Sequence, residues 1–277
     1  SGLRDKGYDY VNIDDCWQVG RESNGTIVVD PARFPSGMRA VADWLHARAL
    51  RFGVYTSATA STCQGRPGSF EFEAVDAAAY CAWGVDYLKI DRCSGASWPE
   101  TNQSWRLFRE GFDACLDATG RPIFESVEYC EPGDACADWI GGVADSWRTS
   151  TDINANWASV LLNADAAQAM HAVAGPGRGW NDPDMLEVGN AGLTATEARS
   201  HFSLWCVLCA PLLIATDLVR ATNETLAILG NERLIALEVA LLGAEAHCEA
   251  LAPVAGLQAR PGGAPVPRLE ARRSPPP

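Results

Sequence analysis

Apolar residues recur along the chain in two alternating patterns, one with the period of a β-strand and one with the period of an α-helix. Strand side chains alternate between two faces, so short runs of Val, Ile, Tyr and Phe with alternating polar residues indicate strands. Such runs lie at 8–14, 50–57, 85–91, 121–128, 145–152, 171–180 and 211–217, of which 171–180 is the weakest. Their spacing of about 30 to 40 residues is that of a repeated strand–helix unit.

The segments between these runs have helical periodicity. Residues 36–50 begin with Ser36, a residue type preferred at helix N-caps, and residues 103–120 end with Gly120, a residue type preferred just after a helix. Residues 195–210 also have an apolar face. Strands that alternate with helices predict an α/β fold with a parallel sheet, and this number of units predicts a (β/α)8 TIM barrel. Only seven strands are recognised, so we expect the first barrel strand to be lacking.

The length and composition fit one large globular domain. The chain has 277 residues, of which 47% are hydrophobic. We assign residues 1–250 to the barrel and the Pro- and Arg-rich residues 251–277 to a disordered tail, because such a composition cannot bury a core. A net charge of −13 without a basic patch argues against a nucleic-acid partner. The longest apolar run, 202–215, is shorter than the roughly 18 residues that span a bilayer, so no membrane partner is expected.

Cysteine content indicates the compartment. The chain has 10 cysteines, a high number for a cytosolic protein, and Cys206 and Cys209 alone have a zinc-like spacing, inside an apolar run. We therefore predict an oxidising compartment and a secreted, lysosomal or vacuolar location. No signal peptide opens the chain, so a mature or truncated form is expected. A homodimer remains open as the state of assembly.

Polar residues cluster at the ends of the predicted strands, where a TIM barrel builds its active site. They are Asp14, Asp15, Tyr55, Lys89, Asp91, Glu128, Arg148, Asp152, Asp182, Asp184 and Asp217. A single carboxylate at a strand end is usually a cap or a turn residue, but carboxylates after six of seven predicted strands are expected to meet in one pocket. Their mutual repulsion must be offset by Lys89, by Arg148 or by a bound partner.

Two chemistries suit such a pocket: metal-assisted catalysis, and glycoside hydrolysis by two carboxyl groups. His171 is the only one of four histidines near a predicted strand, which disfavours zinc. Lys89 shares a strand face with Asp91 and already supplies positive charge, which argues mildly against magnesium, although a simple salt bridge would also explain this pair. Tryptophans at the strand ends could stack on sugar rings or belong to the core: Trp17, Trp147 and Trp180.

Several blocks of the sequence resemble glycoside hydrolase family 27, which holds α-galactosidases and α-N-acetylgalactosaminidases. The blocks are NIDDCW (12–17), DPARFPSGMRAVADWLHARALRFGVYTS (30–57), TCQGRPGSF (62–70), WGVDYLKIDRC (83–93), SWRTSTDI (146–153) and AGPGRGWNDPDML (174–186). The resemblance runs from about Gly7 to Leu237. It implies a TIM barrel that lacks its first strand and most of the family's C-terminal β-sandwich.

The resemblance implies a retaining glycosidase that needs neither a cofactor nor a metal. Asp91 resembles the family's nucleophile and Asp152 its acid/base, with the two carboxyl groups roughly 5–5.5 Å apart. Sugar-binding roles are implied for Lys89 at O3 and O4, for Arg148 and Glu128 at the 2-hydroxyl, and for Asp14 and Asp15 at O6 and the axial O4. Tyr55, Cys63, Asp184 and Met185 resemble further residues of the pocket.

The implied substrate is a carbohydrate with a terminal α-linked galactose. Glu128 and Glu131 fill positions where the family's galactosaminidases carry small residues, which favours galactose over N-acetylgalactosamine. Related family activities on other sugars such as β-L-arabinopyranose, and an inactive or purely sugar-binding barrel, remain alternatives.

The family resemblance also implies disulfide bonds. Cys63 and Cys93 resemble a bridged pair, whereas Cys16 resembles a cysteine bridged to the lacking first strand and is expected to be unpaired. Cys130 and Cys136 flank the loop after the fourth predicted strand, and we expect them to close it with a local disulfide.

Overall fold

The main sheet carries the candidate residues on its strands or in the loops that follow them, and it is parallel throughout. The computed structural model describes residues 2–93 and 97–243. Its main sheet has the order β1-β4-β5-β6-β7-β8. Those strands are β1 (Tyr10–Asn12), β4 (Arg51–Ser57), β5 (Tyr87–Asp91), β6 (Phe124–Val127), β7 (Ser146–Arg148) and β8 (Trp180–Asp182). The described residues thus form an open arc of the expected α/β barrel, in chain order.

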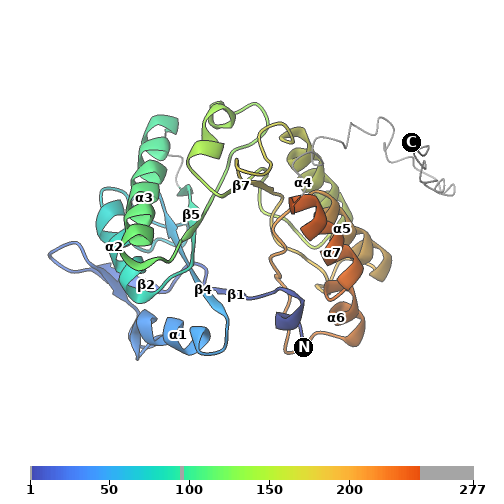
Figure 1. The fold of residues 1–277 in the computed structure, drawn as a ribbon, viewed down its shortest axis with the longest axis horizontal. Helices are drawn as coiled ribbons and strands as arrows, with labels where there is room; N and C mark the ends of the chain where they lie inside the picture. The colour runs from blue at the N-terminus through green and yellow to red at the C-terminus, as the bar shows by residue number, and fades with distance from the viewer. Residues whose placement is uncertain (1, 94–96, 244–277) are drawn as a thin grey trace.

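Helices cover the outside of this arc (Figure 1). They are α1 (Gly37–His46), α2 (Glu73–Trp83), α3 (Trp98–Thr119), α4 (Trp157–Ala169), α5 (Ala195–Val207), α6 (Asn223–Leu229) and α7 (Glu232–Gly243), with short 3-10 turns at Arg4–Lys6, Ala135–Asp138 and Ile140–Gly142. None of the helices in the described ranges is long and apolar enough to cross a membrane. The predicted domain boundary at residue 250 and the tail 251–277 lie outside the described residues.

Both ends of α3 follow local sequence signals, whereas Ser36 at the start of α1 makes no side-chain cap hydrogen bond. Gly120 ends α3 in the left-handed conformation at φ 72°, as its position in the sequence indicates. The start of α3 lies earlier than the sequence pattern suggested, because Ser97 and Glu100 form a capping box and Pro99 occupies the first turn.

Two of the seven predicted strands differ most from the structure. Residues 171–179 form a turn, because Gly175, Gly177 and Gly179 all have positive φ, and strand β8 begins only at Trp180. The predicted strand 211–217 is reduced to a single parallel bridge between Ile214 and Leu186. Pro211 has no N–H to donate, which weakens this run as a strand.

A hairpin that the sequence analysis did not predict projects from the start of the barrel. Strands β2 (Gln18–Arg21) and β3 (Ile27–Val29) pair antiparallel around the turn at Asn24 and Gly25. The Asn-Gly dipeptide between alternating runs was the signal that could have revealed it.

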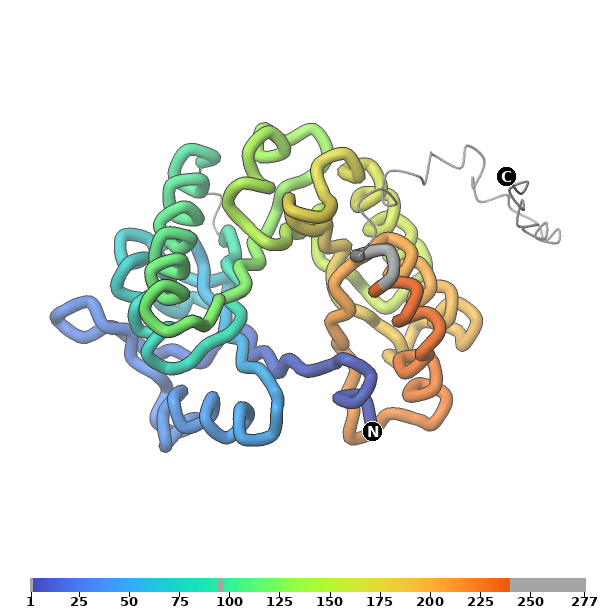
Figure 2. Tube along the Cα trace, viewed as in Figure 1, coloured from blue at the N-terminus to red at the C-terminus, as the bar shows by residue number. Residues whose placement is uncertain are grey.

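The first strand of the arc is only partly covered. Val11 on β1 is 42% exposed, and among the residues that the structure describes β1 pairs with β4 alone. The N-terminal segment before β1 crosses to the opposite side of the molecule, near α6 (Figure 2). There Leu3 belongs to a buried hydrophobic cluster that includes Phe202 and Leu229. The Tyr8 hydroxyl donates a hydrogen bond to the carbonyl oxygen of Leu229 over 2.9 Å. These contacts link the two halves of the arc.

Candidate active site

Asp91 ends β5, and both of its carboxylate oxygens are held by donors. Tyr55 on the neighbouring strand β4 donates its hydroxyl hydrogen to Oδ2 over 2.7 Å, and the backbone N–H of Arg92 donates to Oδ1 over 2.6 Å. Parallel register sets this geometry, since Tyr55 lies opposite Lys89 and Ser57 opposite Asp91. Burial, and then the negative charge of Asp91, raise the pKa of Tyr55, so this phenol remains a donor.

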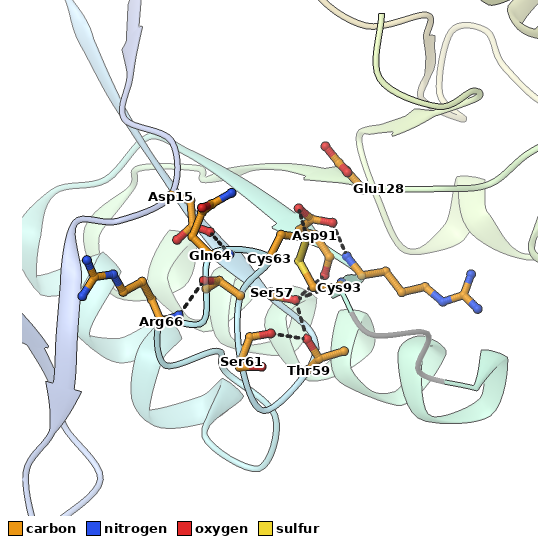
Figure 3. Close-up of a disulfide and its surroundings, with 12 residues drawn as sticks. Asp15, Ser57, Thr59, Ser61, Cys63, Gln64, Arg66, Asp91, Cys93 and Glu128 are labelled. Atoms are coloured by element: carbon orange, nitrogen blue, oxygen red, sulfur yellow. Dashed lines mark hydrogen bonds between the residues drawn. A yellow bond between two sulfur atoms is a disulfide. The ribbon is translucent and has the colours of Figure 1, made fainter.

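A disulfide lies against this carboxylate (Figure 3). Cys63 and Cys93 are bonded, and Sγ of Cys63 lies 3.4 Å from Oδ2 of Asp91. The three groups are close enough to hold a metal ion, but a disulfide has no thiolate to offer as a ligand. The loop that carries Cys63 also contacts Asp15, whose Oδ2 accepts a hydrogen bond from the backbone N–H of Gln64 over 3.0 Å.

Lys89 bridges two carboxylates on either side of it. Its Nζ lies 3.0 Å from Oδ2 of Asp14 and 3.0 Å from Oε1 of Glu128, and 5.3 Å from the centre of the Tyr55 ring. Burial alone would lower the pKa of Lys89, but the charges of Glu128 and Asp14 outweigh it and raise the pKa overall. The ammonium group therefore stays charged and presents hydrogen-bond donors at the strand ends.

Arg148 at the end of β7 connects three carboxylates. It lies 3.0 Å from Glu128 through one terminal nitrogen, and 3.1 Å from Asp152 and 3.0 Å from Asp184 through the other. Its side chain is only 4% exposed, whereas that of Asp152 is 81% exposed. Burial raises the pKa of Glu128 to about 7, although Lys89 and Arg148 favour its charged form.

Most of the candidate residues thus fall into two linked groups. Tyr55, Cys63 and Asp91 form the first, and Asp14, Lys89, Glu128, Arg148, Asp152 and Asp184 form the second, with Lys89 over the Tyr55 ring between them. Asp15 is attached to the loop that bears Cys63. Met185 is half-buried beside Asp184 and donates its backbone N–H to that carboxylate over 2.7 Å.

Other strand-end residues have ordinary structural roles. Trp17 and Trp147 are fully buried, with their indole N–H groups bonded to Tyr55 and Asn181, so neither can stack on a sugar. Asp217 is an exposed turn residue that accepts a hydrogen bond from the N–H of Val219 over 3.0 Å. The usual interpretation of a single strand-end carboxylate therefore applies to Asp217.

Two further disulfides are formed in the described ranges. Cys130 and Cys136 close the loop after β6, and Cys81 joins Cys115 across helices α2 and α3. The second of these pairs was not anticipated, because its cysteines lie on separate helices with no spacing motif. Cys16 is half-buried and has no disulfide partner among the residues that the structure describes.

A buried ion pair that no sequence pattern predicted holds the loop bearing Cys63. Arg21 on β2 forms two hydrogen bonds with Asp76, of 2.7 and 2.5 Å, and donates to the carbonyl oxygen of Gly68 over 2.7 Å. Asp76 also accepts from the hydroxyl of Ser69 over 2.7 Å. No local pattern marks this pair, since its members are far apart in the sequence.

The chain is similar in sequence to a known protein family. The melibiase family model described as "Alpha galactosidase A" matches residues 1–239. Alpha-galactosidase 3 of Arabidopsis thaliana is 47% identical over 247 residues, which are 88% of this chain and 55% of that protein. An α-galactosidase of Oryza sativa subsp. japonica is 43% identical over 248 residues, covering 88% of this chain and 58% of that protein. The chain therefore spans little more than half the length of these curated relatives.

Solved structures agree with the sequence relatives. The α-galactosidase MEL1 of Saccharomyces cerevisiae superposes with a TM-score of 0.78 at 36% identity, covering 86% of this chain and 57% of that one. The α-galactosidase of Saccharomyces cerevisiae solved with raffinose gives a TM-score of 0.75 at 33% identity, with the same two coverages of 86% and 57%. With a family model that matches most of its length and relatives of this similarity, the chain belongs to the α-galactosidase (melibiase) family of glycoside hydrolases, family 27.

Proposed function

We propose that this chain carries the catalytic machinery of a retaining α-galactosidase, which hydrolyses terminal α-linked galactose from oligosaccharides or glycoconjugates. The observation that carries the proposal is the orientation of Asp91. Its two oxygens are held by the Tyr55 hydroxyl and the Arg92 N–H, on a strand end surrounded by polar side chains. A carboxylate fixed in this way is suited to attack a sugar carbon.

In the proposed reaction, Asp91 attacks the anomeric carbon while Asp152 protonates the departing glycosidic oxygen. This gives a galactosyl ester on Asp91, and water then releases galactose while Asp152 takes the proton of that water. Two inversions leave the α-configuration unchanged. The exposure of the Asp152 side chain supports its role, because the acid/base must reach both the leaving group and the incoming water.

Sugar recognition is assigned to the surrounding polar residues. Lys89 is poised to donate to O3 and O4, and Arg148 with Glu128 is assigned to the 2-hydroxyl. Asp14 and Asp15 are acceptors at the β1 end of the site, where we place O6 and the axial O4. A ring of charged donors and acceptors suits a hydroxyl-rich ligand. The pair Asp14 and Asp15 favours galactose over a sugar without an exocyclic O6.

The test is hydrolysis of p-nitrophenyl α-galactoside by the purified chain and by its Asp91→Asn variant. We expect the variant to lose at least about 1,000-fold in kcat, because the amide cannot form the ester intermediate. Asp43→Asn is the matched control, since Asp43 is an exposed residue on α1 that pairs with Arg39. It should keep full activity. Equal activity in Asp91→Asn and the unmodified chain would refute the assignment.

One observation favours a second candidate, a barrel that binds galactose without turnover. Strand β1 leads to Asp14 and Asp15, and its residue Val11 is substantially exposed. The sheet is therefore open next to these two sugar-binding candidates. A folded chain that binds galactose in calorimetry but does not release p-nitrophenol would establish this second function. Rapid hydrolysis by the same preparation would exclude it.

A further inference from the structure

Helix α5 contacts the candidate site through two side chains on one of its faces. His201 and Trp205 are four residues apart, so they project from the same side of the helix, and both are fully buried. Trp205 donates its indole N–H to the carbonyl oxygen of Asp184 over 2.6 Å. The backbone N–H of Glu187 donates to Nε2 of His201 over 3.0 Å. Together they hold both ends of the segment from Asp184 to Glu187.

This segment has a backbone conformation that needs support. Asp184 has φ 80°, a left-handed conformation that non-glycine residues rarely adopt and that carries an energetic cost. Its N–H donates to Oδ1 of Asp182 over 2.8 Å, and Leu186 two residues later is bridged to Ile214. The two side chains of α5 complete a set of contacts that fixes the turn at each end.

The position of Asp184 in this turn determines where the guanidinium group of Arg148 lies. Oδ2 of Asp184 accepts from the backbone N–H of Ile153 over 2.8 Å, and it lies 3.0 Å from a terminal nitrogen of Arg148. The same nitrogen lies 3.1 Å from Oδ1 of Asp152. A shift of Asp184 would therefore move the guanidinium group that holds the exposed Asp152 carboxylate.

His201 is suited to act as an acceptor. Burial lowers the pKa of its imidazole to about 4, so the ring is neutral in a neutral or mildly acidic solution. The neutral ring has one nitrogen free of hydrogen, and the N–H of Glu187 points to Nε2. Trp205 packs against this imidazole, with the two ring centres 4.0 Å apart.

We propose that His201 and Trp205 are positioning residues for the acid/base: they fix the left-handed turn at Asp184, and through Arg148 they keep Asp152 where it can protonate the leaving group. This inference rests on the proposed function, because it needs Asp152 to be the acid. Neither residue touches the sugar in this account, and Asp91 lies outside the chain of contacts.

The test compares two substrates of the chain that differ in how much they need an acid. Methyl α-galactoside has a poor leaving group that must be protonated, whereas 2,4-dinitrophenyl α-galactoside has a leaving group that departs without help. In Trp205→Phe, which loses the indole donor, we expect kcat/KM to fall at least 10-fold more for the methyl substrate than for the aryl substrate. A purely structural defect lowers the amount of active enzyme and therefore lowers kcat/KM equally for both substrates. An equal loss of kcat/KM would overturn the proposal.

Three further variants complete the design. His201→Leu removes the acceptor and should show the same selective loss, and His201→Gln, which restores an acceptor oxygen, should recover most of it. Ser203→Ala on α5 removes a hydrogen bond within the helix, from the Ser203 hydroxyl to the carbonyl of Arg199, and should leave the substrate ratio unchanged. If Trp205→Phe fails to fold, the two His201 variants decide: no difference between Leu and Gln in the substrate ratio would contradict the proposal.

The failure of this inference and that of the proposed function are distinguishable. If the unmodified chain cleaves the aryl substrate and Asp91→Asn does not, the proposed function stands whatever the substrate ratio of the α5 variants. An unchanged ratio in all of those variants would then reject the positioning role alone.

Discussion

The hydroxyl of Tyr55 lies 2.7 Å from Oδ2 of Asp91 and donates its hydrogen to it. The two side chains come from adjacent parallel strands, β4 and β5, and both are buried. The bond orients the carboxylate and lowers its tendency to rotate, and the raised pKa of the phenol keeps the donor protonated. The proposed role of Asp91 as the nucleophile rests on this geometry.

Removal of this donor should weaken catalysis more than folding. In Tyr55→Phe the ring remains and fills the same space, but Asp91 loses one of its hydrogen bonds. A hydrogen bond to a charged group contributes about 1.5–3 kcal/mol, so we expect kcat/KM for p-nitrophenyl α-galactoside to fall by about 10- to 100-fold. Steady-state kinetics measure this fall, and a thermal melt checks that the variant is folded. Unchanged kinetics would show that the bond has no role in the reaction.

The disulfide beside Asp91 should matter for activity as well as for stability. Replacement of Cys63 and Cys93 by Ser opens a loop with a sequence separation of 30 and should lower the free energy of unfolding by about 3–4 kcal/mol. It also releases the loop that bears Cys63 from its fixed position beside Asp91. We therefore expect kcat of the folded fraction to fall at least about 10-fold.

The pair Cys81–Cys115 is the matched control for that experiment. Its sequence separation is 34, but it joins the outer helices α2 and α3. Its double serine variant should lose a similar amount of stability, measured by urea unfolding, and retain its kcat. Equal loss of kcat in both double variants would mean that the disulfide near Asp91 has no special role.

Breaking the buried pair of Arg21 and Asp76 should destabilise the chain strongly. The side chain of Asp76 is 0% exposed and that of Arg21 is 12% exposed. Asp76→Asn leaves a buried guanidinium group without its counter-charge, which costs about 3–5 kcal/mol. Asp43→Asn breaks an exposed pair on α1 and should cost less than about 1 kcal/mol. Urea unfolding of the two variants measures the difference, and similar values would contradict this account.

The stability of the chain should carry a pH dependence from His201. Burial lowers the pKa of this group from 6.5 to about 4 in the folded state. Below pH 6.5 the unfolded chain binds a proton that the folded chain does not, so the free energy of unfolding decreases as the pH falls from 6.5 towards 4, by up to about 3 kcal/mol.

The variant His201→Gln isolates this contribution, because glutamine does not titrate. The quantity to follow is the free energy of unfolding of His201→Gln minus that of the unmodified chain. We expect this difference to increase as the pH is lowered from 7 to 4.5. Urea titrations at several pH values give this difference directly, and other titrating groups cancel in it. A difference that does not change with pH would show that His201 titrates normally.

Much of the arc and of the site could be predicted from the sequence, because both depend on local signals. The five runs at 8–14, 50–57, 85–91, 121–128 and 145–152 have strand periodicity, and each contains a strand of the sheet. Parallel strands bring their ends together, so the clustering of polar residues there follows from the fold alone. The structure brings Lys89, Glu128 and Arg148 into contact as that reasoning requires.

Contacts between distant segments could not be predicted in the same way. The roles of His201 and Trp205 depend on a turn at Asp184 that only the folded chain forms. The glycines at 175, 177 and 179 look compatible with a weak strand until their positive φ values are known. Trp17 and Trp147 show the same limit, because burial and not sequence position decides whether an indole can meet a sugar.

Mass spectrometry of a trapped intermediate tests the central claim most directly, namely that Asp91 is the nucleophile of a retaining reaction. The folded chain would be incubated with 5-fluoro-α-galactosyl fluoride, whose glycosyl-enzyme forms faster than it is hydrolysed, and then digested with pepsin. We predict a fluorogalactosyl group attached to the peptide that contains Asp91, and no label in the Asp91→Asn variant. Label on another carboxylate, or a chain that hydrolyses galactosides without ever becoming labelled, would contradict it.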